Sequence, residues 1–251
     1  MKNMLEFKNV KYFYQTKESE VEALSNVSFS LKEKSFTSLV GPSGCGKTTI
    51  LSLTAGLLSP SSGEILLEGS KIEKNDNRIG YMFQRDHLFE WRTIWQNITL
   101  GLELQGKKKD DRKLQLAETL LKKYDLYNFK NKKPRQLSGG MRQRVALIRT
   151  LVLEPSLLLL DEPFSALDYQ TRVNVCDDVY NIIKSEQKTA LLVTHDIAEA
   201  ISMSDQIVIL SKRPAFVKET LSLSLFGDTP LSKREDKSFG EFFEKIWRSL
   251  V

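Results

Sequence analysis

The sequence predicts an α/β fold with a mainly parallel sheet, and two features carry this prediction. Short, continuous apolar runs occur at residues 157–160, 189–193 and 206–210, and segments of helical period separate them. Such runs are typical of parallel strands that helices cover on both faces. The β-branched run at residues 35–40 also enters a glycine-rich turn, after which residues 47–58 have helical spacing. This order of strand, loop and helix belongs to the same fold class.

A β-rich layer is expected at the N-terminal side of this core. Residues 5–14 and 23–31 alternate between apolar and polar side chains, as half-buried strands do. Residues 62–72 form another predicted strand with turns at both ends. The helix that follows the glycine-rich turn is predicted to end near Gly56.

Two further helices are predicted from apolar spacing. From Asp110 onward, Leu114, Ala117, Leu121 and Tyr124 share one helical face, which predicts a helical insert after the first half of the core. Near the end of the sequence, a face rich in aromatic residues is predicted to dock on the core, with a partner or a membrane as the alternative contact. That face is formed by Phe239, Phe242, Phe243, Ile246, Trp247 and Leu250.

The composition is that of a soluble globular protein. Hydrophobic residues make up 41% and charged residues 27% of the 251 positions. No apolar stretch approaches the roughly 18–20 residues that a bilayer crossing needs. Charged Glu6, Lys8 and Lys11 interrupt the N-terminal segment, so we expect no signal peptide. Cys45 and Cys176 allow at most one bridge, and we expect both to be free thiols in the cytosol.

A formal net charge of +5 permits an anionic partner. Basic residues are concentrated at positions 106–113 and 130–135, but acidic residues interrupt the first run and no aromatic residues alternate with it. We therefore expect solvated loops and helix faces here, and no binding of nucleic acid.

Residues 41–48, GPSGCGKT, match the phosphate-binding P-loop in full. Glycines let successive backbone N–H groups point at phosphates, Lys47 can neutralise the β and γ oxygens, and the Thr48 hydroxyl can coordinate Mg²⁺. Because the helix dipole favours a thiolate near the start of a helix, Cys45 is expected to be reactive. The predicted phosphate-binding residues are Gly41, Pro42, Ser43, Gly44, Cys45, Gly46, Lys47, Thr48 and Thr49.

Polar side chains follow two other predicted strands of the sheet. Asp161 and Glu162 end the apolar run at 157–160, and His195 follows the run at 189–193. At the carboxyl edge of the sheet, Asp161 would hold Mg²⁺, and Glu162 would orient or deprotonate the water that attacks the γ-phosphate. We expect His195 to contact the γ-phosphate, with a hydrogen-bonded structural histidine as the alternative.

A further candidate anion site begins the predicted helix at residues 138–152. Ser138, Gly139 and Gly140 at its N-terminus would expose backbone donors and the positive end of the dipole to an anion. An ordinary capped helix, with glycines for packing, explains the same residues equally well.

These motifs resemble those of the ATP-binding subunit of ATP-binding-cassette (ABC) transporters. The P-loop, Gln84 in YMFQ, LSGGM at 137–141, LLLLDEP at 157–163, SALD at 165–168 and His195 occur in the family's order, over roughly residues 5–213. The resemblance implies an ATPase with a P-loop NTPase core, an N-terminal antiparallel β subdomain and an inserted α-helical subdomain. We expect the ATPase domain at residues 1–220, with the helical subdomain at about 95–151, and a C-terminal extension with an amphipathic helix at 221–251.

The resemblance also implies roles for single residues. Gln84 would reach Mg²⁺ and the attacking water, Asp168 would lie in the loop that links two active sites, and Tyr14 would stack on adenine. Tyr12 lies on the same predicted strand face as Tyr14. Met141 departs from the family, which most often has Gln there, and its side chain cannot donate a hydrogen bond to nucleotide.

A dimer that binds ATP and Mg²⁺ follows from the same resemblance. Each ATP would lie between the P-loop of one copy and Ser138, Gly139, Gly140 and Met141 of the other. Catalysis would use Glu162, His195, Gln84 and Lys47, and the metal would contact Thr48, Gln84 and Asp161. The expected partners are a second copy, two membrane permease subunits and an extracellular solute-binding protein, with the chain peripheral to the cytoplasmic face of the membrane.

Two segments resemble one group within the family. Residues 86–101, with WRT followed by Asn97, and residues 210–214, LSKRP, are similar to importers for nitrate, sulfonates, taurine and thiamine-pyrimidine precursors. In the family, the stretch after Gln84 lines a groove that receives a short helix of the membrane subunit, although core packing also explains Phe89, Trp91 and Trp95. The alternatives are an exporter ATPase, or a soluble ABC ATPase that acts on nucleic acid or ribosomes.

Overall fold

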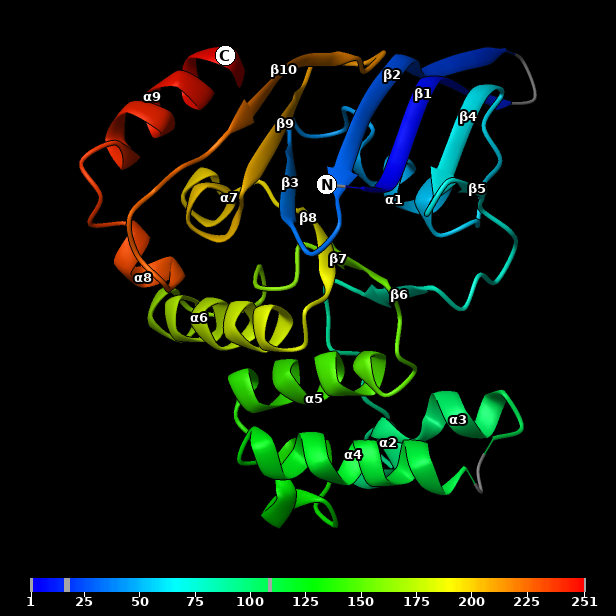
Figure 1. Ribbon diagram of the computed structural model, residues 1–251, viewed down its shortest axis with the longest axis vertical. Coiled ribbons are helices and arrows are strands. Elements are labelled where there is room, and N and C mark those ends of the chain that lie inside the picture. Colours follow the sequence, from blue (N-terminus) through cyan, green and yellow to red (C-terminus); the bar gives the residue numbers. More distant parts are fainter. Residues whose placement is uncertain (1, 16–18, 108–109, 251) are drawn as a thin grey trace.

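The computed structural model describes residues 2–15, 19–107 and 110–250 and confirms the α/β prediction (Figure 1). The molecule contains two sheets, of which the four-stranded one lies at one side in Figure 1. One has four strands in the order β2-β1-β4-β5, and the other has six strands in the order β10-β9-β3-β8-β7-β6. The strands are β1 (Asn3–Gln15), β2 (Glu20–Lys32), β3 (Phe36–Val40), β4 (Ser62–Leu67), β5 (Ser70–Lys71), β6 (Ile79–Met82), β7 (Leu157–Asp161), β8 (Thr189–Val193), β9 (Gln206–Leu210) and β10 (Val217–Ser222).

The six-stranded sheet is mainly parallel because helical crossovers connect most of its strands. β9, β3, β8, β7 and β6 pair in parallel, whereas β10 is antiparallel to β9. The α-helices are α1 (Lys47–Thr54), α2 (Ile94–Ile98), α3 (Leu100–Leu104), α4 (Asp111–Lys123), α5 (Gly139–Leu151), α6 (Tyr169–Ser185), α7 (Ile197–Met203), α8 (Pro230–Lys233) and α9 (Phe239–Leu250).

Both faces of the parallel sheet are covered, as the continuous apolar runs predict. On β7, Leu158 and Leu160 belong to the core formed with α5 and α6, whereas Leu157 and Leu159 belong to the core shared with α1 and the antiparallel sheet. All four leucines are fully buried. Because side chains alternate along a strand, burial on both faces favours an apolar residue at every position.

The four-stranded sheet is antiparallel, in agreement with the predicted N-terminal β layer. The prediction of one strand over residues 62–72 is wrong, because this segment turns back on itself as the β4–β5 hairpin. Glu68 and Gly69 occupy the turn with φ angles of 52° and 80°. Two consecutive left-handed residues give the twist that a two-residue hairpin loop requires.

A helical layer follows the first half of the core, as expected. Asp110 caps α4 by accepting a hydrogen bond from the N–H of Lys113, and α4 buries Ala117, Leu120 and Leu121. In Figure 1, α2, α3 and α4 lie on the side of α5 that faces away from the sheets. The boundaries of 95–151 for a helical subdomain and of 221–251 for an extension stay predictions.

The C-terminal helix α9 docks on the core through only part of its predicted face. Ile246 is fully buried beside α7 and β9, and three other members of the face, Phe239, Phe242 and Leu250, pack around it. Phe243 and Trp247 point outward, and Trp247 is 56% exposed. The docked stripe is therefore narrower than the apolar face that the spacing predicts.

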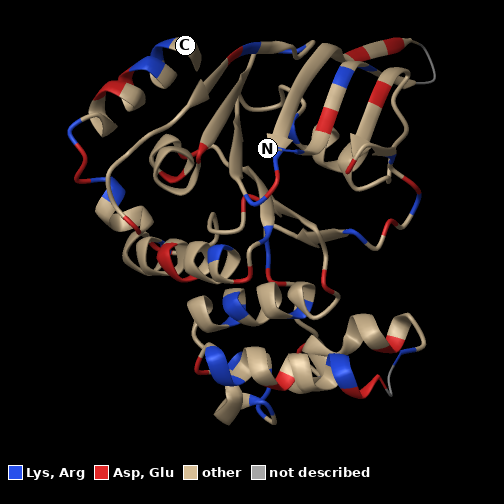
Figure 2. Ribbon diagram, in the orientation of Figure 1, with Lys and Arg blue, Asp and Glu red and all other residues tan. Residues whose placement is uncertain are grey.

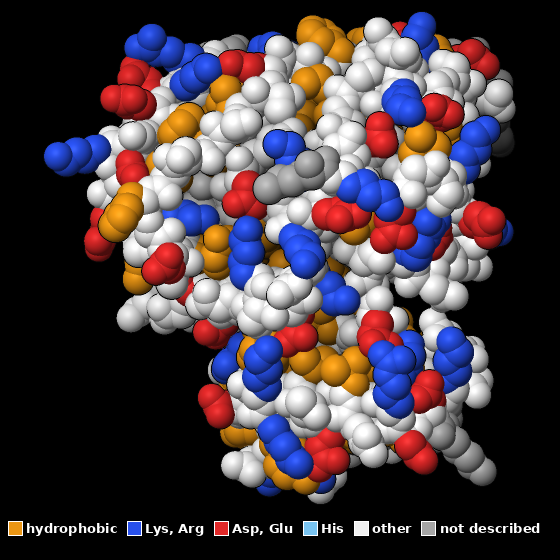
Figure 3. All heavy atoms as spheres, viewed as in Figure 1, with side chains coloured by type: hydrophobic (Ala, Val, Ile, Leu, Met, Phe, Trp, Pro, Cys, Tyr) orange, Lys and Arg blue, Asp and Glu red, His pale blue; other side chains and the backbone are white. Residues whose placement is uncertain are grey.

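Charged residues of both signs are spread over the helices and loops (Figure 2). On the face drawn in Figure 3, acidic and basic side chains intermingle and hydrophobic side chains lie between them. Within the described ranges, no helix is both long and apolar enough to cross a membrane.

Gly63, at the start of β4, offers a test of how closely the antiparallel strands approach. Its φ is +81°, and an added Cβ would lie 2.4 Å from the carbonyl oxygen of Asn9. Gly63→Ala should therefore lower the free energy of unfolding by roughly 2–4 kcal/mol, from the left-handed backbone and the clash together. Urea denaturation measures this loss.

Gly69→Ala is the matched control for that measurement. Gly69 has a φ of +80°, but an added Cβ there would meet nothing within 4 Å. Its replacement should cost only about 1 kcal/mol, which is the backbone term alone. Equal losses at the two positions would contradict the close approach at Gly63.

Candidate nucleotide-binding site

The P-loop lies between a buried strand and the start of α1. All five residues of β3 are buried, and α1 begins at Lys47 directly after the loop. Gly46 has a φ of +119°, and an added Cβ would lie 2.9 Å from Leu24 of β2. Only glycine permits this turn and this close approach together.

Lys47 reaches back over the loop that precedes it. Its Nζ donates hydrogen bonds to the carbonyl oxygens of Gly41 (2.8 Å) and Pro42 (3.0 Å), and the residue is only 8% exposed. Both acceptors are uncharged carbonyl oxygens, so these two hydrogen bonds do not neutralise the ammonium charge. The arrangement is suited to an incoming anion, which would meet a fixed positive charge.

A cavity of about 350 Å³ opens beside the loop. Tyr14 lies at its wall, where its hydroxyl shares a 3.0 Å hydrogen bond with Thr49 Oγ1. Tyr12 instead packs against the core, edge-on to the Tyr14 ring. The lining residues are Tyr14, Ala23, Ser43, Gly44, Gly46, Lys47, Thr48, Thr49, Glu162 and Arg213. Of the predicted phosphate-binding residues, Gly41, Pro42 and Cys45 are not part of this lining.

Arg213 is a residue of this cavity that the sequence reasoning missed. Its guanidinium carbon lies 6.0 Å from the centre of the Tyr14 ring, and its Nε donates to the carbonyl of Glu22. It belongs to the LSKRP segment, which we used only to identify a group within the family. A basic residue shortly after a strand of the parallel sheet was the available signal.

Asp161 is the last residue of β7 and is half-buried. Its Oδ2 accepts a hydrogen bond of 3.0 Å from the hydroxyl of Tyr81 on β6. Burial raises the pKa of this carboxyl and the charge of Glu162 adds to that rise, whereas the Tyr81 hydrogen bond and Lys47 oppose it. A carboxylate held in this way gains from a nearby cation.

Glu162 and His195 are in contact. The N–H of Glu162 donates to the carbonyl of Val193 at the end of β8, and the residue has a left-handed φ of 44°. Glu162 Oε2 lies 3.0 Å from His195 Nδ1. The two predicted side chains therefore meet at the carboxyl edge of the sheet, where Glu162 also lines the cavity.

Gln84 lies close to this edge but outside the cavity lining. Its Nε2 donates to Ser165 Oγ (3.1 Å), and Ser165 Oγ donates to the carbonyl of Glu162 (2.9 Å). Gln84 is thus connected to the turn after Glu162 through a serine that the sequence reasoning did not single out. Its predicted contacts with metal and water stay predictions.

The second candidate anion site lies on α5, away from the P-loop cavity. Ser138 caps the helix by accepting a hydrogen bond of 3.3 Å from the N–H of Met141. An added Cβ on Gly139 would lie 3.0 Å from Leu167, and one on Gly140 would lie 2.7 Å from Val175. Capping and packing thus both explain these residues, and the anion role stays a prediction. Met141 is half-buried and packs against the core.

Asp168 is exposed and caps α6. Its carboxylate accepts a hydrogen bond of 3.0 Å from the N–H of Thr171. This backbone hydrogen bond is the main reason that the pKa of Asp168 lies below its usual value. The loop at residues 165–168 therefore ends in a fixed, charged cap at the surface.

The expected thiolate at Cys45 is wrong. The residue is 1% exposed, and burial raises the pKa of its thiol more strongly than Lys47 and the backbone lower it. The helix dipole favours the thiolate, but the desolvation of the buried sulfur opposes the charged form. Cys45 and Cys176 are both free and buried.

The residues present are compatible with Mg²⁺ held partly by phosphate. In the described part of the chain, no group of three or more His, Cys, Asp or Glu side chains could hold a metal by itself. Mg²⁺ commonly uses one or two protein ligands together with phosphate oxygens and water. Asp161 and the exposed Thr48 hydroxyl supply ligands of that kind.

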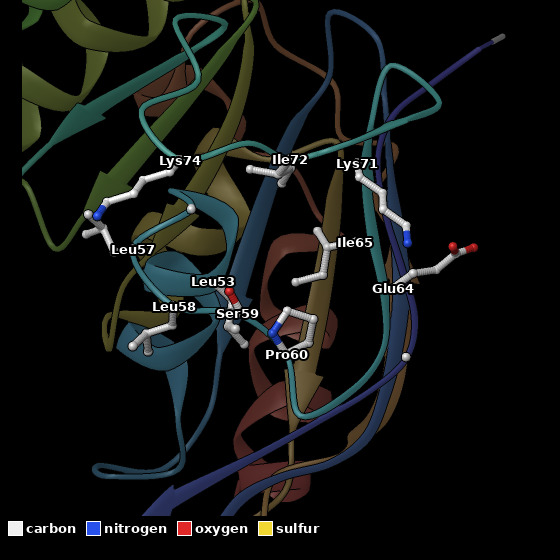
Figure 4. Close-up of a pocket in the computed structure, with 12 residues that line it drawn as sticks. Leu53, Leu57, Leu58, Ser59, Pro60, Glu64, Ile65, Lys71, Ile72 and Lys74 are labelled. Carbon is white, nitrogen blue, oxygen red and sulfur yellow. The ribbon is translucent and has the colours of Figure 1, made fainter.

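Another cavity, of about 470 Å³, lies between the end of α1 and the β4–β5 hairpin. Figure 4 shows Leu53, Leu57 and Leu58 on one side of it and Ile65 and Ile72 on the other. It shares no lining residue with the P-loop cavity. It therefore has no part in the nucleotide site described above.

The fold and the site define a P-loop ATPase, and the comparisons with known proteins give its family. Residues 24–165 match the family model described as ABC transporter. The chain is 43% identical to the uncharacterized ABC transporter ATP-binding protein YtlC of Bacillus subtilis, over 99% of this chain and 96% of that protein. This chain therefore belongs to the ABC transporter family. It is an ATP-binding, ATP-hydrolysing subunit of that family.

Other relatives carry names of importers. The aliphatic sulfonates import ATP-binding protein SsuB of Bacillus cereus is 38% identical over 94% of this chain and 92% of its own length. The nitrate import ATP-binding protein NrtD of Synechocystis is 37% identical, over 96% of this chain and 91% of that protein.

Solved structures confirm the cassette fold. A dimeric post-hydrolysis state of the ATP-binding cassette MJ0796, bound to ADP and Pi, is similar with a TM-score of 0.70 and 33% identity, over 89% of this chain and all of that one. CbiO1 of Clostridium perfringens, part of the ABC transporter complex cbiONQ, is similar with a TM-score of 0.79 and 25% identity, over 98% of this chain and 93% of that one.

The burial of Cys45 predicts slow alkylation. At pH 7–8, where a free cysteine is partly ionised, iodoacetamide should label Cys45 at least about tenfold more slowly in the folded chain than in the urea-unfolded chain. The raised pKa lowers the fraction of thiolate, and burial keeps the reagent from the sulfur. Labelling should accelerate as the pH rises above 9. Mass spectrometry of the Cys45 peptide measures the rate, and fast labelling of the folded chain at pH 7 would contradict this placement.

Proposed function

We propose that this chain energises a membrane importer for a small anionic or heterocyclic solute, of the nitrate, sulfonate, taurine or pyrimidine-precursor type. The importer names of SsuB, NrtD and the taurine relative TauB support this proposal. In it, ATP closes a dimer of two copies, and hydrolysis opens the dimer again. The dimeric cassettes among the similar structures are the basis for the second copy.

The observation that carries the hydrolysis step of the proposal is the contact between Glu162 and His195 beside the P-loop cavity. A carboxylate that lines the cavity can orient or deprotonate a water molecule, and the imidazole next to it can contact the γ-phosphate. Lys47 would neutralise the β and γ oxygens. Gln84, which donates a hydrogen bond to Ser165, would contact Mg²⁺ and the attacking water.

The nucleotide would occupy the cavity with its phosphates in the P-loop. Tyr14, at the wall, would stack on the adenine ring, and the N–H groups of residues 41–49 would bind the phosphates. Bound Mg²⁺ would neutralise phosphate charge. Thr48, Asp161 and Gln84 are the residues that would hold it, because they offer oxygen ligands.

The second copy would complete the site. Ser138, Gly139, Gly140 and Met141 of one copy would cover the phosphates held by the P-loop of the other, and Asp168 would lie between the two sites. The positive end of a helix of 13 residues is a suitable cover for a γ-phosphate, which ADP lacks. ATP would therefore favour the closed dimer more than ADP does.

Two permease subunits and an extracellular solute-binding protein would complete the transporter, with this chain peripheral to the cytoplasmic face of the membrane. The segment after Gln84 presents an aromatic surface that suits a permease. Trp91 is 69% exposed, and its ring lies 4.7 Å from that of Phe89. Exposed aromatic residues of this kind are enriched at protein interfaces.

Glu162→Gln tests the proposed chemistry. It should leave ATP binding intact and slow hydrolysis by roughly two or more orders of magnitude, because the amide cannot accept a proton from water. The variant should also accumulate as a dimer with ATP in analytical ultracentrifugation. Lys47→Ala is the contrasting variant, and it should weaken ATP binding itself in calorimetry. If Glu162→Gln hydrolysed ATP at nearly the wild-type rate, Glu162 could not be the residue that activates the water.

ATP-dependent uptake tests the importer proposal. The chain, expressed with its permeases, should co-purify with them and drive uptake of a labelled sulfonate or nitrate into right-side-out vesicles only when ATP is enclosed. The Glu162→Gln transporter should assemble but not transport. Export of the solute, or purification with ribosomes in place of permeases, would contradict the proposal.

A further inference from the structure

Arg172, in the first turn of α6, contacts the loops on both sides of it. Its Nη2 donates a hydrogen bond of 2.9 Å to the carbonyl of Leu167, the residue before Asp168. Its Nη1 lies 3.7 Å from Oδ2 of Asp196, the residue after His195. One guanidinium thus joins the surface loop at 165–168 to the turn that carries His195.

Glu199 forms the buried end of this connection. It lies on α7, is 3% exposed, and has its Oε1 at 3.8 Å from Arg172 Nε. Its Oε2 accepts a hydrogen bond of 2.7 Å from Thr194 Oγ1, and Thr194 Oγ1 accepts one of 3.0 Å from the N–H of Asp196. The carboxylate therefore holds both neighbours of His195 in place.

The other end of the connection touches the start of α5. Leu167, whose carbonyl binds Arg172, packs so closely on Gly139 that an added Cβ there would lie 3.0 Å from its side chain. A continuous set of contacts thus runs from Gly139 through Leu167, Arg172 and Glu199 to the turn at His195.

Arg172 lies near the carboxylates of Asp196 and Glu199 but is too far from both for a strong hydrogen bond. Its Nε is buried and, among the described residues, has no hydrogen-bond partner. The distances of 3.7 and 3.8 Å to Asp196 and Glu199 exceed those of charge-assisted hydrogen bonds, about 2.7–2.9 Å. A buried donor that lacks a partner favours any rearrangement that supplies one.

We propose that Arg172 is a positioning residue that couples the 165–168 loop to His195 through Glu199, and that its contacts with the carboxylates tighten when the dimer closes. The inference rests on the proposed function, in which His195 acts on the ATP of its own copy while Gly139 covers the ATP of the other. Within one copy, Arg172 then connects a residue at that copy's own ATP with a residue at the ATP of the other copy. A guanidinium suits this task because its planar fork donates in several directions at once, which an ammonium does not reproduce.

Steady-state ATPase kinetics of the transporter, or of the isolated chain if it turns over, test the inference. Arg172→Met should lower kcat about tenfold, leave KM for ATP within about twofold, and reduce the Hill coefficient toward 1, because the P-loop is untouched while His195 loses its support. Arg172→Lys should recover part of kcat. Arg172→Met with Glu199→Gln should lose no more than the worse single variant, since both changes break one connection.

Arg144→Met is the matched control. Arg144 has the same side-chain exposure as Arg172, 24%, and like Arg172 it pairs with a carboxylate, here Asp178 on α6. Among the described residues its contacts are with Asp178 and the carbonyl of Tyr124, and not with the 165–168 loop or His195. The kcat and the Hill coefficient of Arg144→Met should stay within about twofold of the wild-type values. Thermal unfolding of each variant is measured alongside, and the comparison uses variants that melt within a few degrees of one another.

Two results would overturn the inference. One is a loss of kcat in Arg172→Met no greater than in Arg144→Met. The other is a fall in kcat with an unchanged Hill coefficient and additive losses in the double variant. A wild-type chain that hydrolyses ATP without any dependence on a second copy would instead overturn the proposed function, so the two failures are distinguishable.

Discussion

The site depends on the hydrogen-bonded adjacency of β3, β8 and β7 in one parallel sheet. β8 pairs with β3 on one side and with β7 on the other, so the P-loop, the His195 turn and the Asp161–Glu162 pair leave the sheet at the same edge. Neighbouring strands are only about 4.8 Å apart. Because both faces are packed with leucine, valine and isoleucine, a slip of register would break two cores at once. Burial of the strands thus fixes where the P-loop, the His195 turn and the Asp161–Glu162 pair leave the sheet.

The hydrogen bonds of two charged side chains at that edge, Lys47 and Asp161, are made with neutral partners. The ammonium of Lys47 rests on neutral carbonyls, and the carboxyl of Asp161 is half-buried with a phenol as its donor. Burial and the nearby Glu162 both raise the pKa of Asp161. A bound phosphate would give Lys47 an anionic partner, and a cation would give Asp161 a positive one.

The sequence predicts most of the fold because burial on both faces leaves an unbroken apolar run, and the P-loop has a spacing that few other sites share. It does not predict the β4–β5 hairpin, because Glu68 gives no sign of its left-handed backbone. It also misses Arg213, Tyr81 and Ser165, whose roles arise from contacts between distant segments. The error at Cys45 has the same cause, since local charge can be read along a chain but desolvation depends on the folded surroundings.

The two explanations of Ser138 that the sequence leaves open are compatible with each other. As a cap, its hydroxyl oxygen accepts a hydrogen bond from Met141, and at 3.3 Å this bond is longer than the usual 2.9–3.0 Å. A hydroxyl that accepts one hydrogen bond still has its own proton to donate. The same serine can therefore hold the helix start in shape and offer that proton to a phosphate oxygen of a second copy. Glycine at 139 and 140 serves the close packing on Leu167 and Val175. The helix cap and the proposed contact with a phosphate would therefore use different atoms of Ser138, so the two roles do not exclude each other.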